Sequence, residues 1–167
     1  MATASSRKRT LNTAEIPLLP SNFFTGVWTP QNSGNIYTMH KAAAATTTVA
    51  IIPVPKAQQG GFEADAKPSV IEVNYLVTTA ALTSAPTAVL NKLTKNTDGT
   101  YTRTAVTQVL TFSGLDTVGT ATGAHNAVVT ITTPAELADN ETLQLALTMN
   151  EAATSVLDIN ALTVTYT

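Results

Sequence analysis

The chain has 167 residues, a formal net charge of −2 at pH 7 and no cysteine, and only 12% of its residues are charged. This length suggests a single domain that buries roughly 70% of the surface of the unfolded chain. The absence of cysteine excludes disulfides, thiolate metal sites and thiol nucleophiles, and is compatible with folding in a reducing cytoplasm. The small negative net charge argues against direct binding of nucleic acid.

Residues 1–20 predict an extended arm. The arm carries a basic triplet and three apolar residues, namely Arg7, Lys8, Arg9, Ile16, Leu18 and Leu19. Prolines around the apolar group disfavour a helix and a central strand, so we expect this segment not to pair with the sheet. No Lys or Arg follows Arg103, while the final third of the chain is acidic, so the arm can attract an acidic surface of another molecule. The alternative is a solvated tail.

We therefore divide the chain into an extended arm at residues 1–22 and a β-sandwich domain at residues 23–167. No apolar run approaches the roughly 20 residues of a membrane-spanning helix, and none resembles the core of a signal peptide. We expect a soluble chain with no membrane partner.

The strongest local signal is a hairpin centred on Asp98-Gly99, a pair that favours a two-residue type I′ turn. With this turn, Leu93 faces Thr104, and residues 100–112 form one continuous strand. Side chains alternate across a strand. The predicted buried face of the hairpin consists of Val89, Leu93, Val106, Leu110 and Phe112.

Further strands follow from period-two alternation of apolar and polar residues. Residues 71–77 read as a half-buried strand, and residues 143–149 show the cleanest alternation, so we expect the latter at the centre of the buried face. Residues 162–166 repeat the pattern after a phase shift at 158–160, where we expect a bulge or a corner. The glycine-rich segment 113–126 is too long for a tight turn, so we expect it to cross between sheets.

About eight strands and hardly any helix predict an all-β fold. We expect a two-sheet antiparallel sandwich, jelly-roll-like, with the extended N-terminal arm. An immunoglobulin-like sandwich is the alternative, because the sequence does not determine the strand order. The surface rich in threonine and alanine suits either repeated protein contacts in an assembly or simply a low-charge β domain.

Few residues suggest chemistry. Ser113, Asp116 and His125 are close enough in sequence to form a catalytic triad, but no nucleophile-elbow pattern supports one. His40 and His125 each lack a second metal ligand at the usual spacing. We therefore expect no catalytic residue, no cofactor and no enzymatic activity.

An acidic loop at residues 136–141 offers oxygen ligands of the kind that calcium prefers. The candidate ligands are Asp139, Asn140 and Glu141, with Asp116 or Glu151 from a neighbouring loop. A solvated acidic turn is the alternative, and it is the one we favour, so we expect no metal site. Aromatic residues make up only 5% of the chain, which gives little support to a carbohydrate-binding surface.

The segment 119–167 resembles the C-terminal half of small β-sandwich virion proteins of tailed bacteriophages. The likeness lies in Gly119-Thr120-Ala121, Gly123-Ala124-His125, Thr132-Thr133-Pro134, Ala152-Ala153-Thr154-Ser155-Val156 and the alternating terminal strand. Such proteins decorate or cement a capsid, are non-enzymatic and often trimeric, and frequently bind the shell through a terminal arm. The resemblance thus implies a virion protein assembled in the host cytoplasm.

Two functions follow as expectations. The first is a capsid decoration protein that docks on a phage shell through its arm, with the major capsid protein or another virion protein as partner and a homo-oligomer, preferably a trimer, as its state. The second is a receptor- or glycan-binding sandwich module of a tail or fibre.

Overall fold

The computed structural model describes residues 7–12, 24–25, 28–33, 36–56 and 66–167, which form twelve β-strands and no helix. The strands are β1 (Arg7–Asn12), β2 (Phe24–Thr25), β3 (Trp28–Ser33), β4 (Ile36–Lys41), β5 (Thr47–Val54), β6 (Pro68–Thr78), β7 (Ser84–Lys95), β8 (Tyr101–Ala105), β9 (Gln108–Gly114), β10 (Gly123–Ile131), β11 (Glu141–Asn150) and β12 (Val156–Tyr166). No helix in this part of the chain is long and apolar enough to cross a membrane.

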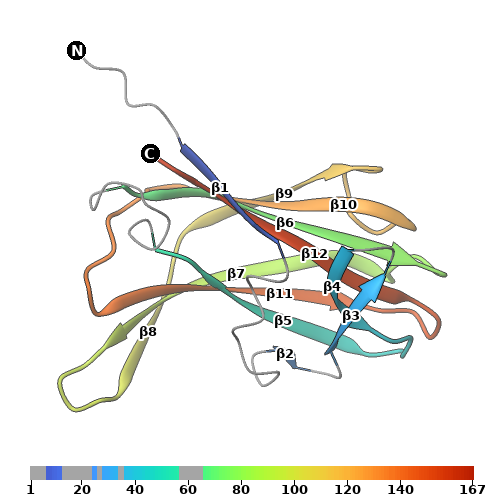
Figure 1. Cartoon of the computed structure of the whole chain (residues 1–167), viewed down its shortest axis with the longest axis horizontal. Helices are drawn as coiled ribbons and strands as arrows, with labels where there is room; N and C mark the ends of the chain where they lie inside the picture. The colour runs from blue at the N-terminus through green and yellow to red at the C-terminus, as the bar shows by residue number, and fades with distance from the viewer. Residues whose placement is uncertain (1–6, 13–23, 26–27, 34–35, 57–65) are drawn as a thin grey trace.

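The strands form two antiparallel sheets arranged as a sandwich (Figure 1). The seven-stranded sheet has the order β3-β4-β12-β6-β10-β9, with β1 also beside β12, and the five-stranded sheet has the order β2-β5-β11-β7-β8. The pairs are nested along the chain, because β4 pairs with β12, β5 with β11 and β6 with β10. A hairpin rolled up in this way is a jelly roll, so the predicted fold class is confirmed.

Alternation along β6 and β11 builds the layer between the sheets. Their inward side chains are all buried: Ile71, Val73, Tyr75, Val77, Leu143, Leu145, Leu147 and Met149. β11 is the middle strand of the five-stranded sheet, which confirms its predicted central place. The β-branched and leucine side chains pack well on a pleated surface, which explains why these segments are strands.

The predicted irregularity in the last strand is a β-bulge. The register of β12 against β6 shifts between Ile159 and Ala161, so Asn160 is the extra residue. Leu157 and Ile159 are buried before the bulge, and Leu162 is buried after it. The extra residue keeps both halves of β12 facing the core despite the phase shift in the sequence.

The β7–β8 hairpin exists, but its turn is one residue longer than predicted. The amide of Asn96 donates to Thr100 O (2.8 Å), and the amide of Gly99 donates to Asn96 O (3.1 Å). Gly99 has a φ of 83°, which glycine adopts without strain. The loop is thus a three-residue turn that ends in a left-handed glycine, a common hairpin type.

This longer loop changes the register and therefore the faces of the hairpin. Leu93 lies opposite Arg103 instead of Thr104. Leu90 is fully buried, whereas Val89 is 50% exposed, so the predicted buried face is wrong in β7. Its other predicted members Val106, Leu110 and Phe112 are partly buried and do pack against the core. A shift of one residue moves every side chain of a strand to the other face, which explains the error.

The predicted single strand at residues 100–112 is also wrong. β8 belongs to the five-stranded sheet, and the chain then passes to the seven-stranded sheet as β9. Conversely, the segment 113–126 does not cross between sheets, because β9 and β10 pair directly within one sheet. Residues 115–122 of this glycine-rich stretch are the loop of that hairpin, and its two ends belong to β9 and β10.

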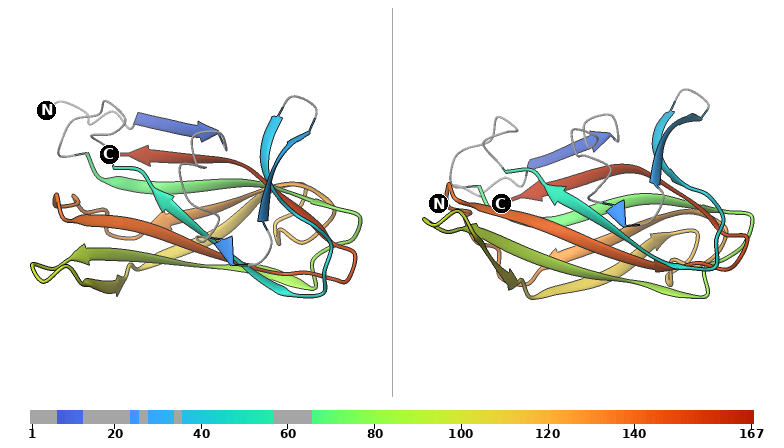
Figure 2. Two further views of the ribbon diagram at one scale, coloured as in Figure 1. Left: turned by 60° about the horizontal axis from the view of Figure 1, so that its bottom comes forward. Right: turned by 90° about the horizontal axis from the view of Figure 1, so that it is seen from below.

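Part of the N-terminal arm pairs with the sandwich, contrary to the expectation from its sequence. β1 runs antiparallel to β12 over six residues, with Arg7 opposite Tyr166 and Asn12 opposite Ala161. β4 pairs with β12 only at residues 157–159. β1 and β4 therefore follow one another along the same strand. Figure 2 shows the β3–β4 hairpin rising away from the rest of the sandwich at one end.

Candidate functional site

A row of three asparagines crosses the outer face of the seven-stranded sheet. They come from neighbouring strands, Asn160 from β12, Asn74 from β6 and Asn126 from β10. Asn160 Nδ2 donates to Asn74 Oδ1 (2.9 Å), and Asn74 Nδ2 donates to Asn126 Oδ1 (2.9 Å). We call these three residues the amide row. Each is half-buried, so the row is accessible from solvent.

The fold explains how the amide row forms. Tyr75 points inward and is fully buried, so its neighbour Asn74 points outward. Asn126 lies directly opposite Asn74 on β10. The bulge in β12 supplies Asn160 as an extra residue beside the position opposite Asn74. A bulge commonly re-aims a side chain, and here it brings the third amide into line.

The amide row has two open ends. A carboxamide offers two donor hydrogens and an acceptor oxygen with two lone pairs. Among the described residues, Asn126 Nδ2 and Asn160 Oδ1 make no hydrogen bond to protein atoms. One end of the row therefore presents donors and the other an acceptor, a combination that suits hydroxyl groups of a ligand.

A pair formed by an aspartate and a histidine extends this polar surface toward β4. Asp158 Oδ1 accepts a hydrogen bond from Thr38 Oγ1 (3.2 Å) and contacts His40 Nδ1 (2.9 Å). Asp158 stands on β12 two residues before Asn160. His40, one of the two candidate metal ligands considered from the sequence, is thus engaged with a carboxylate.

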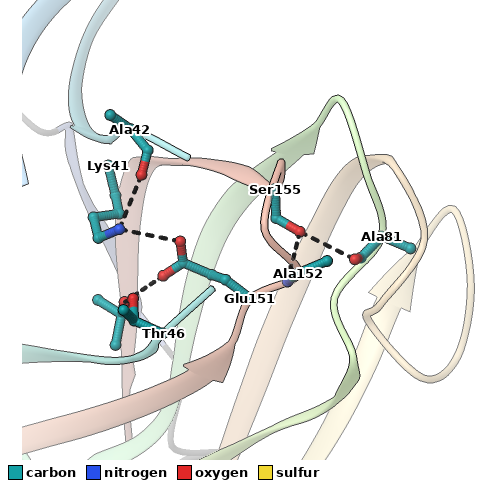
Figure 3. Close-up of polar contacts among 8 residues, drawn as sticks. Lys41, Ala42, Thr46, Ala81, Glu151, Ala152 and Ser155 are labelled. Carbon is teal, nitrogen blue, oxygen red and sulfur yellow. Dashed lines mark hydrogen bonds and ion pairs between the residues drawn. The ribbon is translucent and has the colours of Figure 1, made fainter. Parts of the chain in front are cut away.

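A buried ion pair lies at the end of the sandwich where β4 meets β5 (Figure 3). Lys41 Nζ donates to Glu151 Oε2 (3.2 Å) and to Ala42 O (2.9 Å), and Thr48 Oγ1 donates to Glu151 Oε1. The two charged side chains are 7% and 0% exposed. Together with Ser155, which donates to Ala81 O, these contacts hold the loops at this end.

A shallow depression of about 430 Å³ adjoins the ion pair and is lined by residues 41–44 and 46–48. Its walls are mainly alanine and threonine side chains, and Lys41 Nζ is already satisfied by the contacts above. The contacts of Lys41 stabilise the loops, and the residues that line this depression include no candidate catalytic group.

The second histidine, His125, is a buried structural residue. Its ring stacks on Tyr75 with centroids 5.3 Å apart, and its Nε2 donates to Ala121 O (2.8 Å). Asp116 Oδ1 lies 3.7 Å from Nδ1. Ser113 is opposite Asn126, on the outer face, so it stands on the other side of the sheet from His125. The structure thus brings Asp116 and His125 together but excludes Ser113 as their nucleophile.

Asp116 instead organises the β9–β10 loop. Its carboxylate accepts hydrogen bonds from the amides of Ala121 (2.9 Å), Gly119 and Val118 (3.0 Å). These bonds, that of Ala121 foremost, hold the pKa of the Asp116 carboxyl below its usual range. Burial raises the pKa of Tyr75, whose hydroxyl donates to Gly119 O (2.7 Å), and the nearby Asp116 charge adds to this.

We expect Asp116→Asn to lower the melting temperature at pH 7 and to lower it by less near pH 3. A carboxyl whose folded pKa is depressed stabilises the fold above its unfolded pKa, about 4, and loses this contribution as pH falls through the folded pKa. Melting curves across pH 3–7 measure the difference. A gap between wild type and variant that stays constant with pH would contradict this role.

Gly119 is required by the same loop. It has a φ of 73°, and a Cβ there would meet the Tyr75 hydroxyl and come within 2.6 Å of Phe112 Cδ1. Gly119→Ala is therefore expected to destabilise the protein more than Gly99→Ala, measured by urea unfolding. Gly99 is the matched control, since its φ is similar but a Cβ there meets nothing within 4 Å. Equal losses of unfolding free energy in the two variants would mean that the β9–β10 loop shifts to relieve the contact of the new Cβ with Tyr75 and Phe112.

The residues considered for calcium do not converge. Glu141 Oε1 pairs with Lys92 Nζ (2.6 Å), and this contact lowers the pKa of the Glu141 carboxyl. Asn140 donates to Lys95 O (3.0 Å). Glu151 is committed to Lys41 at the opposite end of β11. Within the described part of the chain, no three His, Asp or Glu side chains cluster as metal ligands would.

The six arm residues considered for docking fall in two groups. Arg7, Lys8 and Arg9 stand in β1, beside β12. Ile16, Leu18 and Leu19 lie outside the described residues. Docking through the arm therefore remains a prediction.

No known protein family matches the chain, and no curated protein matches it. One similar solved structure is a family two carbohydrate esterase from Cellvibrio japonicus, with a TM-score of 0.44 and 7% identity over 98% of this chain and 35% of that one. Another is a carbohydrate-binding module, TmCBM27, studied for specific mannan recognition, with a TM-score of 0.45 and 8% identity over 98% of each chain.

The amide row was missed by reasoning from sequence. The hydrogen-bonded neighbours in the row are 52 and 86 residues apart in the sequence and come together only through the strand order. The one available signal was the phase shift near Asn160, which pointed to a bulge but not to its neighbours.

Proposed function

We propose that this chain is a non-enzymatic binding module that recognises a glycan on the outer face of the seven-stranded sheet. The observation that carries this proposal is the amide row, with donors open at Asn126 and an acceptor open at Asn160. Sugar hydroxyls donate and accept hydrogen bonds at once, and neutral amides pair with them without the desolvation cost of a charged group.

The surroundings of the row support binding over catalysis. His125 is buried, and the carboxylates of Asp158 and Asp116 are engaged with neighbouring groups. Leu76 and Val128 flank the row on the same face of β6 and β10, where apolar side chains can contact the C–H faces of sugar rings. Such a mixture of apolar contact and a few placed polar groups is typical of ligand sites.

A glycan array probed with the labelled full chain tests this function. We expect binding to a restricted set of glycans, and we expect Asn126→Ala to weaken that binding about tenfold, the effect of losing one or two good hydrogen bonds. Thr130→Ala is the matched control, because Thr130 is exposed on β10 outside the row. A chain that binds no glycan on the array would overturn the proposal.

A second candidate function is attachment to a larger protein assembly, as a capsid decoration protein attaches to a phage shell. It is favoured by the outer face of the five-stranded sheet, where uncharged side chains lie side by side. One cross-strand row runs Val89, Ala146 and Ile51, and the next runs Thr87, Thr148 and Val49. Small uncharged side chains lose little entropy when a partner covers them.

In this second function the partner is the major capsid protein or another virion protein, the location is the virion, and the free protein is a homo-oligomer, a trimer by preference. Co-sedimentation with phage shells and the mass of the free protein test it. Replacing Arg7, Lys8 and Arg9 by Ala should weaken attachment mainly at low salt, because salt screens exposed charges. Full attachment by a Val89→Asp variant would exclude the five-stranded sheet as the docking face.

A further inference from the structure

We infer that the amide row selects neutral oligosaccharides over acidic ones, and that Glu72 sets this selectivity. The inference rests on the proposed glycan function and adds the ligand class. Glu72 stands on β6 two residues before Asn74, so the two side chains share the outer face. It lies opposite Val128 of β10 and Thr163 of β12. Its carboxylate therefore borders the row.

The strands of the row supply no positive charge to balance this carboxylate. β6, β10 and β12 contain no Lys or Arg. Among residues 36–56 and 66–167, no Lys, Arg or His nitrogen lies within ion-pair distance of Glu72. The nearest basic residues along the sheet stand in β1, one strand beyond β12, where Lys8 is opposite Thr165. A ligand carboxylate over the row would thus meet Glu72 on one side and Asp158 on the other.

The size of the row favours an oligosaccharide over a single sugar. Neighbouring strands lie about 4.8 Å apart, so the three strands extend the row over about 10 Å. This length exceeds one pyranose ring and continues through Asp158 to His40 on β4. A ligand lying across the strands can reach the open donor at Asn126 and the open acceptor at Asn160 at the same time.

The size of the selectivity follows from the charge separation. Two like charges some 5–6 Å apart on a half-buried surface repel enough to change affinity about five- to tenfold. Because the face is open to water, added salt reduces this repulsion. The affinity for a neutral ligand does not depend on this repulsion.

The test compares a neutral oligosaccharide that binds the wild type with its analogue carrying one uronic acid, using isothermal titration calorimetry on the full chain. We expect Glu72→Gln to raise affinity for the acidic analogue five- to tenfold and to change affinity for the neutral ligand less than twofold. At high salt, the affinity for the acidic analogue should no longer differ between Glu72→Gln and the wild type. Glu136→Gln is the matched control, since it removes the same charge from an exposed loop away from the row.

The outcomes separate the inference from the function on which it rests. In one outcome, neutral ligands bind and Asn126→Ala lowers their affinity, but Glu72→Gln changes the affinity for the acidic analogue no more than Glu136→Gln does. The role of Glu72 is then wrong, while glycan recognition stands. If the wild type prefers the acidic analogue, the selectivity is wrong. If the wild type binds neither ligand nor any other glycan, both the inference and the proposed function fall.

Discussion

Lys41→Met is expected to lower the free energy of unfolding by about 3–5 kcal/mol, because it leaves the Glu151 carboxylate buried without its partner. Lys41 Nζ lies 3.2 Å from Glu151 Oε2, and the Glu151 side chain has no exposed surface. Thr48 remains as a donor, but a hydroxyl does not offset a buried charge. Urea unfolding followed by circular dichroism gives the loss.

Two further variants show whether burial causes this loss. The double variant Lys41→Met/Glu151→Leu should recover most of the stability, since replacing both members of a buried pair by apolar residues is often neutral or stabilising. Lys92→Met breaks the more exposed pair with Glu141, and we expect a loss of about 1 kcal/mol or less. Similar losses for Lys41→Met and Lys92→Met would show that water reaches the Lys41–Glu151 pair.

The sequence predicts best where one physical signal decides the outcome. In β11, leucines at every second position must face the core, and Leu143 to Met149 do so. In β12 the alternation breaks near Asn160, and a bulge is the simplest way to keep Leu157 and Leu162 on the same side. The class of an all-β sandwich follows from counting such strands and finding no helical periodicity, whereas the choice between a jelly roll and an immunoglobulin-like sandwich needs the strand order.

The errors arise where two nearly equal choices compete. Asp98-Gly99 fits a two-residue turn as well as a three-residue loop. The longer loop places Leu93 opposite Arg103 instead of Thr104, and this shift of one residue reverses which face of β7 lies on the same side as a given residue of β8. The passage from β8 to β9 has no break in composition to mark it. β1 pairs through its backbone with the free edge of β12, and backbone pairing leaves no pattern in the side chains of Arg7–Asn12.

The candidate site could not be predicted, for a related reason. An asparagine on the outer face of a strand looks like any polar residue of an antiparallel sheet. Asn74, Asn126 and Asn160 become a site only because β6 lies between β10 and β12, and the strand order is a long-range property of the fold. Glu72 lies beside this site for the same reason, because it stands on β6 with Asn74.

Leu145→Asp is expected to prevent folding altogether. Leu145 is fully buried in the middle strand of the five-stranded sheet, paired with Ile52 on one side and Leu90 on the other. A carboxylate between two sheets has no partner there, and its cost of several kcal/mol is a large part of the 5–15 kcal/mol that stabilises a typical domain. Leu145→Ala, which leaves only a cavity, should cost about 2–5 kcal/mol and still fold.

Thr148→Asp on the same strand is the matched control for the direction of the side chain. Thr148 lies opposite Val49 and Thr87 and is half-buried on the outer face, where water solvates a carboxylate. We expect this variant to fold, with a loss of about 1 kcal/mol from the poor strand propensity of aspartate. Far-ultraviolet circular dichroism and urea unfolding distinguish the variants. Equal damage from Leu145→Asp and Thr148→Asp would mean that both faces of β11 are buried, and the outer face of the five-stranded sheet would then be covered rather than available to a partner.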